Sequence, residues 1–224
     1  RPGERLACAQ YNSPGLIPQG APPEKIRLKK VWPDGILVSG SRYGRGGESM
    51  TCEIRKWELS DAADLAAAVS NKRVQDNLRD GLPYPYTRQD GVAYISEMLS
   101  ADENKVFAFA IVLGNRAVGS IGIVRQENIH RQTAELGYYL AEEYWGQGLM
   151  TEAVKKACQA VFEKSDILRI FAEPFAGNAA SCRVLEKAGF QYEGTLRSNA
   201  VKNGRVVDMK LYALLNMGRI NVND

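Results

Sequence analysis

The chain has 224 residues, enough for one full-sized domain, and 45% hydrophobic with 25% charged residues is ordinary for a soluble globular protein. No apolar run approaches the roughly 20 residues of a membrane-spanning helix, and the first 23 residues contain no apolar segment of the secretory kind, so neither a membrane nor a secreted protein is expected. The formal charge of +3 comes from residues 1–49, since residues 50–224 carry 21 Lys and Arg against 22 Asp and Glu. Because no basic stripe with interleaved aromatic residues occurs in that near-neutral part, no nucleic-acid partner is expected.

The cysteines indicate whether a metal site is expected and which cellular compartment the protein occupies. Cys8, Cys52, Cys158 and Cys182 show no CxxC or other metal-ligand spacing, and His130 is the single histidine in the sequence, so no metal is expected. Cys158 and Cys182 lie in helical patterns, where a buried free thiol is the simpler interpretation. Such cysteine usage is typical of a reducing compartment, which predicts a cytoplasmic protein.

Residues 1–49 differ in kind from the rest. They hold six of the nine prolines and eight of the 21 glycines and show no sustained hydrophobic period, with a short strand conceivable only at 35–38. We interpret 1–49 as a basic, Gly/Pro-rich appendage: a linker, a translated upstream stretch or a transit-like leader. The folded domain is expected to span 50–217, with 218–224 as a C-terminal tail.

The first part of the domain predicts a strand and two helices. An alternating strand begins at Glu53, and Ser60 is expected to cap a helix that runs to Val69 with acidic residues in its first turn. The segment 83–86 (PYPY) breaks the chain. The segment 87–90 (TRQD) then opens a second helix with a capping-box-like pair.

The second part predicts six strands and two helices. In chain order these are strands at 106–113, 117–124 and 133–140, a helix at 149–162, a strand at 167–172, a helix at 178–188 ended by Gly189, and strands at 190–197 and 206–215 turned at Asn203-Gly204. The order is thus β-α-α-β-β-β-α-β-α-β-β. A first half with strands joined in hairpins, followed by a second half in which strands and helices alternate, predicts a three-layer α/β domain of the mixed α+β kind around a mixed sheet.

The turn before the 149–162 helix is the first candidate site. Gly146 and Gly148 flank Gln147, and backbone amides at such a helix start favour an anion such as pyrophosphate. By itself this pattern is equally consistent with a simple tight turn. It is not a dinucleotide fingerprint, because Thr151 stands where the third glycine would be, and no Gly-Lys-Ser/Thr of a Walker loop follows.

Four segments together indicate a family. They are 135–140 (ELGYYL), 144–151 (YWGQGLMT), 178–190 (NAASCRVLEKAGF) followed by Glu193-Gly194, and 208–212 (DMKLY). In order and spacing they resemble the GNAT acetyltransferase superfamily, and within it the ribosomal-protein N-acetyltransferase (Rim-type) branch. The resemblance covers about 53–215. It implies a three-layer GNAT-type fold whose mixed central sheet is splayed between 133–140 and 167–172 to hold acyl-CoA.

The resemblance also implies the cosubstrate, acetyl-CoA, with no metal. Its pyrophosphate would lie on the backbone amides of 146–151, in agreement with the helix-start argument. The implied cofactor-binding residues are Leu140, Gly146, Gln147, Gly148, Leu149, Met150, Thr151 and Asn178. The family pattern is Gln/Arg-x-x-Gly-x-Gly/Ala, whereas this chain has Trp145 first and Met150 last. Because backbone amides bind the anion, both changes are expected to be tolerated, with Met150 narrowing the approach.

The resemblance also implies roles for residues around the thioester. Ser181 matches the family position near the cofactor sulfur, where its hydroxyl can donate to the departing thiolate. An ordinary first-turn helix serine is the alternative. The backbone N–H of Tyr139 or Leu140 is the expected oxyanion donor. Asn178 is expected both to cap its helix and to contact the pantetheine arm.

The general base is open between several residues. Glu135 lies in the strand facing the split and could relay a proton through water, while pairing with Arg125 or Arg131 in the hairpin is about as probable. Asp208 is a weaker candidate. His130 is expected to be an exposed loop residue.

The acceptor is inferred from the chemistry of amines. An α-amine with a pKa of about 8 is roughly one-tenth neutral at pH 7, whereas less than about a thousandth of lysine, with a pKa of about 10.4, is neutral. The lack of an obvious strong base therefore favours an N-terminal α-amine of a peptide or protein, attacked directly in a ternary complex. A polyamine, amino acid or antibiotic is the alternative acceptor. An inactive acyl-CoA-binding module, suggested by Trp145 and Met150, is the third hypothesis. A monomer or a homodimer is expected.

Overall fold

The structure is a computed structural model that describes residues 51–220. The predicted appendage at 1–49, its strand at 35–38 and residues 221–224 of the predicted tail lie outside the described residues. The boundaries at 50 and 217 stay predictions. No helix between 51 and 220 is long and apolar enough to cross a membrane.

Seven strands form one mixed sheet, in the spatial order β1-β2-β3-β4-β5-β7-β6. They are β1 (Glu53–Arg55), β2 (Val106–Leu113), β3 (Arg116–Arg125), β4 (Thr133–Leu140), β5 (Arg169–Ala172), β6 (Gln191–Lys202) and β7 (Arg205–Leu215). All neighbouring strands run antiparallel except β4 and β5, which are parallel. The predicted mixed sheet is therefore confirmed.

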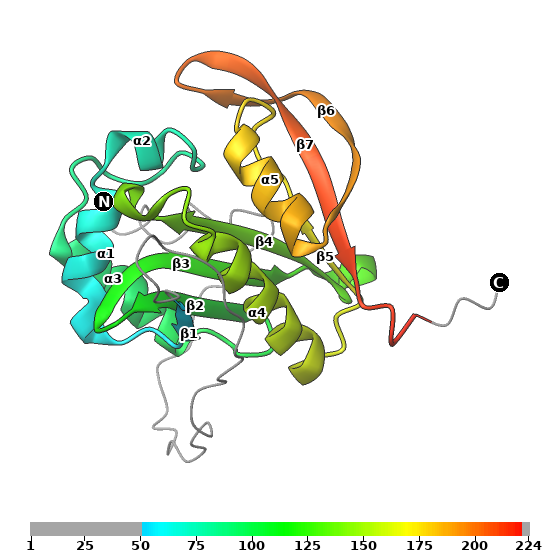
Figure 1. The fold of residues 1–224 in the computed structure, drawn as a ribbon, viewed down its shortest axis with the longest axis horizontal. Coiled ribbons are helices and arrows are strands. Elements are labelled where there is room, and N and C mark those ends of the chain that lie inside the picture. Colours follow the sequence, from blue (N-terminus) through cyan, green and yellow to red (C-terminus); the bar gives the residue numbers. More distant parts are fainter. Residues whose placement is uncertain (1–50, 221–224) are drawn as a thin grey trace.

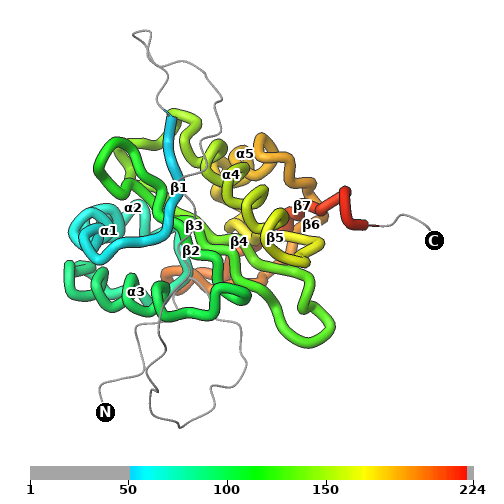
Figure 2. Tube along the Cα trace, turned by 90° about the horizontal axis from the view of Figure 1, so that it is seen from below, coloured from blue at the N-terminus to red at the C-terminus, as the bar shows by residue number. Residues whose placement is uncertain are grey.

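Helices cover both faces of this sheet. They are α1 (Ala62–Val69), α2 (Lys72–Gln75), α3 (Arg88–Ser100), α4 (Leu149–Lys164) and α5 (Ala179–Ala188). Figure 2 shows α1 and α3 on one side of the strands and α4 on the other. Successive side chains of β2 point to opposite faces of the sheet, so β2 contributes to the hydrophobic core on each face. Ile111 packs in the cluster with α4, whereas Ala110 and Val112 pack in the cluster with α1 and α3. The three-layer α/β architecture is thus confirmed.

The first helix begins differently from the sequence prediction. Ser60 does not cap it; its hydroxyl donates to the Glu58 carboxylate at 3.3 Å. The chain first makes a 3-10 turn at Leu59–Asp61, with a capping box between Glu58 and Asp61, and α1 then continues from Ala62. The prediction was wrong because this turn moves the cap two residues upstream. The second capping box, Thr87 with Asp90 at the start of α3, is confirmed.

Asp61 ties this turn to β1. Its side chain is 5% exposed, and Arg55 donates to its two oxygens at 2.7 and 2.8 Å. Burial alone would raise the pKa of Asp61, but hydrogen bonds from Arg55 and from the Glu58 N–H, together with the Arg55 charge, outweigh burial and lower it. The carboxylate is therefore held in its charged form by the fold.

Replacing Asp61 by asparagine is expected to lower the free energy of unfolding by about 2–3 kcal/mol, because a buried charge-assisted pair is broken and Arg55 loses its bidentate carboxylate. Because the folded-state pKa is lowered, this stabilisation is present above the ordinary carboxyl pKa of about 3.9 and is lost as pH falls below it. Urea unfolding at pH 7 and at pH 3 measures both effects. Glu103→Gln, at a carboxylate 62% exposed, is the control and should change stability by less than about 0.5 kcal/mol.

Candidate active site

The sheet opens between its two parallel strands. β4 and β5 pair at only three positions, from Thr133 with Arg169 to Glu135 with Phe171. Beyond Glu135, β4 continues to Leu140, whereas β5 ends at Ala172. In the view of Figure 1, β4 runs between α4 and α5, and β5 is seen beside the end of α5. The carboxyl half of β4 therefore has no strand partner on its β5 side, which is the split that the resemblance predicts.

A cavity of about 540 Å³ occupies the split. Its walls come from β4, the 144–151 segment, the end of β5, α5 and the loop after α2. Of the predicted site residues, it is lined by Glu135, Tyr139, Leu140, Gly146, Gly148, Leu149, Met150, Thr151, Asn178 and Ser181. Gln147 is the predicted residue that this wall lacks. One cavity thus brings together residues that are up to 46 positions apart in the sequence, from Glu135 to Ser181.

The start of α4 is open to an anion. Gly146 and Gly148 have φ of +76° and +83°, and a Cβ at either position would meet nothing within 4 Å. Both glycines therefore adopt left-handed backbone, which other residues rarely do, and an added Cβ would meet no protein atom there. No side chain caps α4, and its first backbone bond runs from the Glu152 N–H to the Gly148 carbonyl at 3.2 Å. The amides from Leu149 to Thr151 therefore have no partner within the helix, as an anion-binding helix start requires.

The two residues that depart from the family pattern are both accommodated. The Trp145 indole donates to the Leu140 carbonyl at 2.8 Å, and the Arg73 guanidinium lies 5.5 Å from its ring centroid. Met150 is 7% exposed and packs in the α4 core. The Gln147 side chain turns back to donate to the Glu143 carbonyl at 3.0 Å, so Gln147 can contribute only its backbone to the site.

Ser181 is linked to a tyrosine that the sequence analysis did not single out. Asn178 accepts the Ser181 N–H at 3.0 Å, as predicted for a helix cap. The Tyr138 hydroxyl lies 2.8 Å from the Ser181 hydroxyl and 3.2 Å from its carbonyl. Burial raises the pKa of Tyr138 well above its usual value, so its hydroxyl stays protonated. The single Tyr138 proton can therefore be donated to the Ser181 carbonyl or to the Ser181 hydroxyl, and in the second arrangement the serine proton is free for another acceptor.

The pairing of β4 distinguishes the two candidate oxyanion donors. The Ala141 N–H donates to the Val118 carbonyl at 2.8 Å, toward β3. Because N–H directions alternate along a strand, Tyr139 also points its N–H toward β3, and Leu140 points its N–H into the split. The Tyr139 side chain lies in the α1–α3 core and is 7% exposed. The geometry favours the Leu140 amide.

Glu135 lies in the cavity wall with a partner other than the predicted ones. Its carboxylate pairs with Arg79, from the loop after α2. Arg125, one of the predicted partners, is opposite Ala134 in the β3–β4 register, so its side chain lies on the other face of the sheet and pairs with Asp166 at 2.7 Å. Arg131 offers its carbonyl to Arg125. The predicted hairpin pairing was therefore wrong.

The electrostatics of Glu135 suit a base. Burial raises its pKa, the Arg79 charge and hydrogen bond lower it, and the Glu173 charge raises it, with a net increase. Neither alternative base lines the cavity: Asp208 accepts the Ser198 N–H at 2.7 Å, and His130 lies in an exposed 3-10 turn. Within residues 51–220, no three His, Cys, Asp or Glu side chains are grouped as a metal site needs.

The fold and this cavity define an acyl-CoA-dependent transferase, and comparison with known proteins specifies it. A family model described as acetyltransferase (GNAT) domain matches residues 52–191. The chain is 37% identical to the probable N-acetyltransferase YjcK of Bacillus subtilis, over 54% of this chain and 66% of that protein. It is 33% identical to the putative ribosomal N-acetyltransferase YdaF of the same organism, over 51% of this chain and 62% of that protein. The match to YjcK therefore covers just under two thirds of that relative.

A solved structure shares the fold. The ribosomal-protein-S5-alanine acetyltransferase from Vibrio fischeri superposes with a TM-score of 0.68 at 22% identity, covering 75% of this chain and 95% of that one. The chain belongs to the GNAT acetyltransferase family, with the likeness to its Rim-type branch that the sequence predicts. The predicted class of enzyme, an N-acetyltransferase, is confirmed.

Proposed function

We propose that the protein transfers an acetyl group from acetyl-CoA to the α-amine of a peptide or protein N-terminus, in a ternary complex. The observation that carries this proposal is the combination in one cavity of an uncapped helix start, a serine hydroxyl 2.8 Å from a tyrosine hydroxyl, and a buried carboxylate. The first binds a diphosphate, the second protonates a leaving thiolate, and the third receives a proton from an amine.

The cosubstrate is placed by α4. Its pyrophosphate would accept hydrogen bonds from the free amides of residues 149–151, and Asn178 would contact the pantetheine arm. The Leu140 N–H, which points into the split, would then donate to the thioester carbonyl oxygen. This amide stabilises the negative charge that forms on that oxygen when the amine attacks.

The transfer is completed by two proton movements. The amine nitrogen bonds to the thioester carbon, the carbonyl electron pair moves to oxygen, and its return expels the sulfur. The thiolate takes the Ser181 proton, which water entering the open cavity replaces, while the Tyr138 hydroxyl, 2.8 Å from that of Ser181, stays protonated. The proton of the attacking nitrogen passes to Glu135, directly or through one water.

An α-amine fits this site better than a lysine. About one-tenth of an α-amine is already neutral at pH 7, so a single carboxylate is sufficient to remove the proton after attack. YdaF, named as a putative ribosomal N-acetyltransferase, supports a protein acceptor. A small amine is the second acceptor class, and a cytoplasmic location and a monomer or homodimer stay predictions.

Release of free thiol from acetyl-CoA tests the activity. We expect peptides with a free N-terminus to release thiol faster than polyamines, amino acids or aminoglycosides at equal concentration. Faster release with a small amine would transfer the proposal to that acceptor class. Tight acetyl-CoA binding without thiol release with any amine would identify a binding module and contradict the proposed enzyme.

A further inference from the structure

Arg79 is a loop residue whose side chain lines the cavity. It reaches from the loop between α2 and α3 into the cavity and pairs with the Glu135 carboxylate. The Arg79 side chain is 34% exposed and that of Glu135 is 13% exposed. The pair is thus formed at the cavity wall, with the guanidinium on the more open side. The ion pair therefore includes the carboxylate that, in the proposed mechanism, receives the proton of the acceptor amine.

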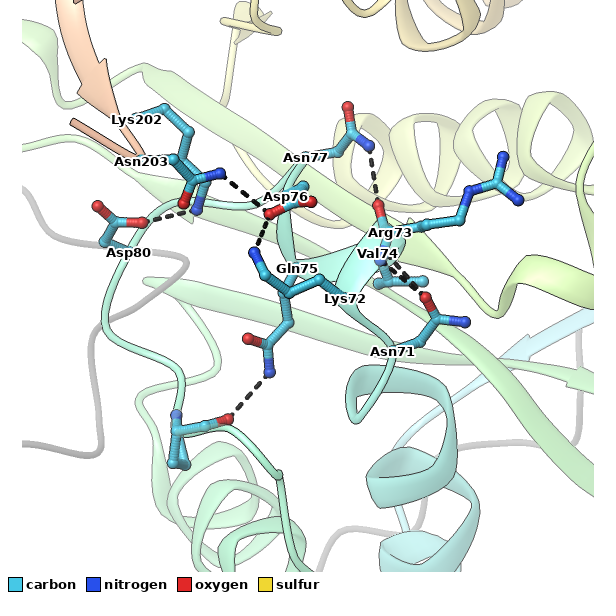
Figure 3. Close-up of polar contacts among 11 residues, drawn as sticks. Asn71, Lys72, Arg73, Val74, Gln75, Asp76, Asn77, Asp80, Lys202 and Asn203 are labelled. Carbon is cyan, nitrogen blue, oxygen red and sulfur yellow. Dashed lines mark hydrogen bonds and ion pairs between the residues drawn. The ribbon is translucent and has the colours of Figure 1, made fainter. Parts of the chain in front are cut away.

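Contacts with the tip of the β6–β7 hairpin hold the Arg79 loop in place. Lys202 pairs with Asp80 at 2.6 Å, and Asn203 donates to Asp76 at 3.1 Å (Figure 3). Asp76 also pairs with Lys72 of α2, and Gln75 donates to the Pro83 carbonyl at 2.9 Å. These anchors lie on both sides of Arg79 in the sequence. The loop is therefore fixed where its arginine can reach Glu135.

Glu173 adds a second carboxylate to the same cavity. It directly follows β5 and forms no hydrogen bond or ion pair with the residues that the structure describes. Its charge acts against ionisation of Glu135, while that of Arg79 favours it. The other charged side chains in the wall, Arg183 and Lys187, come from α5 on the cofactor side.

We propose that Arg79 is a positioning residue that keeps Glu135 ionised despite burial and the charge of Glu173, and that Glu173 holds the acceptor ammonium beside that base. Arg79, Glu135 and Glu173 together carry one net negative charge, which one acceptor ammonium neutralises. The site is therefore matched to an acceptor with a single cation at its reacting end. This inference rests on the proposed function, because it takes Glu135 as the base.

Two variants should move the pH dependence in opposite directions. With Arg79→Gln, the pKa of Glu135 rises, so the variant loses activity relative to wild type as pH falls, with the acid limb displaced upward by about one pH unit. With Glu173→Gln, the pKa of Glu135 falls, and the acid limb moves downward. We plot the ratio of variant to wild-type kcat/KM at each pH with one peptide acceptor, so that protonation of the acceptor cancels. Arg79→Lys should keep the wild-type limb.

The controls separate this role from a structural one. Arg131→Gln, whose side chain lies outside the cavity, should give a ratio of one at every pH. A ratio independent of pH in both test variants would overturn the role of Arg79 and Glu173. Carbon NMR titration of the Glu135 carboxyl in wild type and in Arg79→Gln measures the same effect without turnover. If the wild-type protein is inactive toward every amine, the proposed function is refuted, and the titration still tests the role of Arg79. If Arg79→Gln does not fold, Glu173→Gln and Arg79→Lys still test the proposal.

Discussion

Replacement of Ser181 by alanine is expected to lower kcat about 100-fold, at the lower end of what a positioned proton donor contributes, and to leave the KM for acetyl-CoA nearly unchanged. The hydroxyl lies 2.8 Å from the Tyr138 hydroxyl, and its removal leaves the departing thiolate without a donor. The Ser181 backbone N–H, which Asn178 caps at 3.0 Å, is unaffected, so the helix start is preserved. Steady-state thiol release measures both parameters.

Two further variants make this expectation specific. Tyr138→Phe should cause a smaller loss of kcat than Ser181→Ala, because the serine still carries a proton after the tyrosine is removed. Ser100→Ala, at the exposed end of α3, should have wild-type kinetics. An unchanged kcat in Ser181→Ala would show that Ser181 is an ordinary helix serine and that the thiolate leaves without its help.

Replacement of Gly148 by valine is expected to weaken acetyl-CoA binding about 10- to 100-fold. The φ of +83° at this position costs a β-branched residue about 1–3 kcal/mol of strain, while the side chain itself meets nothing within 4 Å. Relief of that strain rotates the peptide units that direct the amides of residues 149–151 at the pyrophosphate. Isothermal titration with acetyl-CoA measures the dissociation constant.

The structure contains a matched control for this variant. Gly114 has a φ of +59°, an added Cβ there also meets nothing within 4 Å, and it lies in the β2–β3 turn, outside the cavity. Gly114→Val should therefore cost similar stability and leave acetyl-CoA binding unchanged. Equal affinity for acetyl-CoA in wild type and Gly148→Val would contradict binding of the pyrophosphate by the start of α4.

Much of the fold could be predicted because its signals are local. Residues 133–140 match β4, and Asn178 caps α5 while Gly189 ends it. Asn203 and Gly204 both have positive φ, as the predicted hairpin turn requires. The helix α2 was missed because its four residues are too few for a periodic pattern.

The candidate site was only partly predictable. The anion-binding amides at the start of α4 could be predicted, because two glycines before a helix are a local sequence pattern. Pairing of Arg79 with Glu135 joins residues 56 positions apart, and it depends on how the loop after α2 folds over the split. The choice of Leu140 over Tyr139 depends on which side of β4 faces β3, and a strand sequence alone does not contain that information.

The position of the acetyl group on a product peptide distinguishes an α-amine acceptor from a lysine. One peptide with a free N-terminus and an internal lysine is incubated with the protein and acetyl-CoA, beside the same peptide with a blocked N-terminus, and both are sequenced by tandem mass spectrometry. We predict one acetyl group, on the α-amine of the first peptide, and little or none on the second. Acetylation of the lysine at equal rates in both peptides would contradict transfer to the N-terminal α-amine.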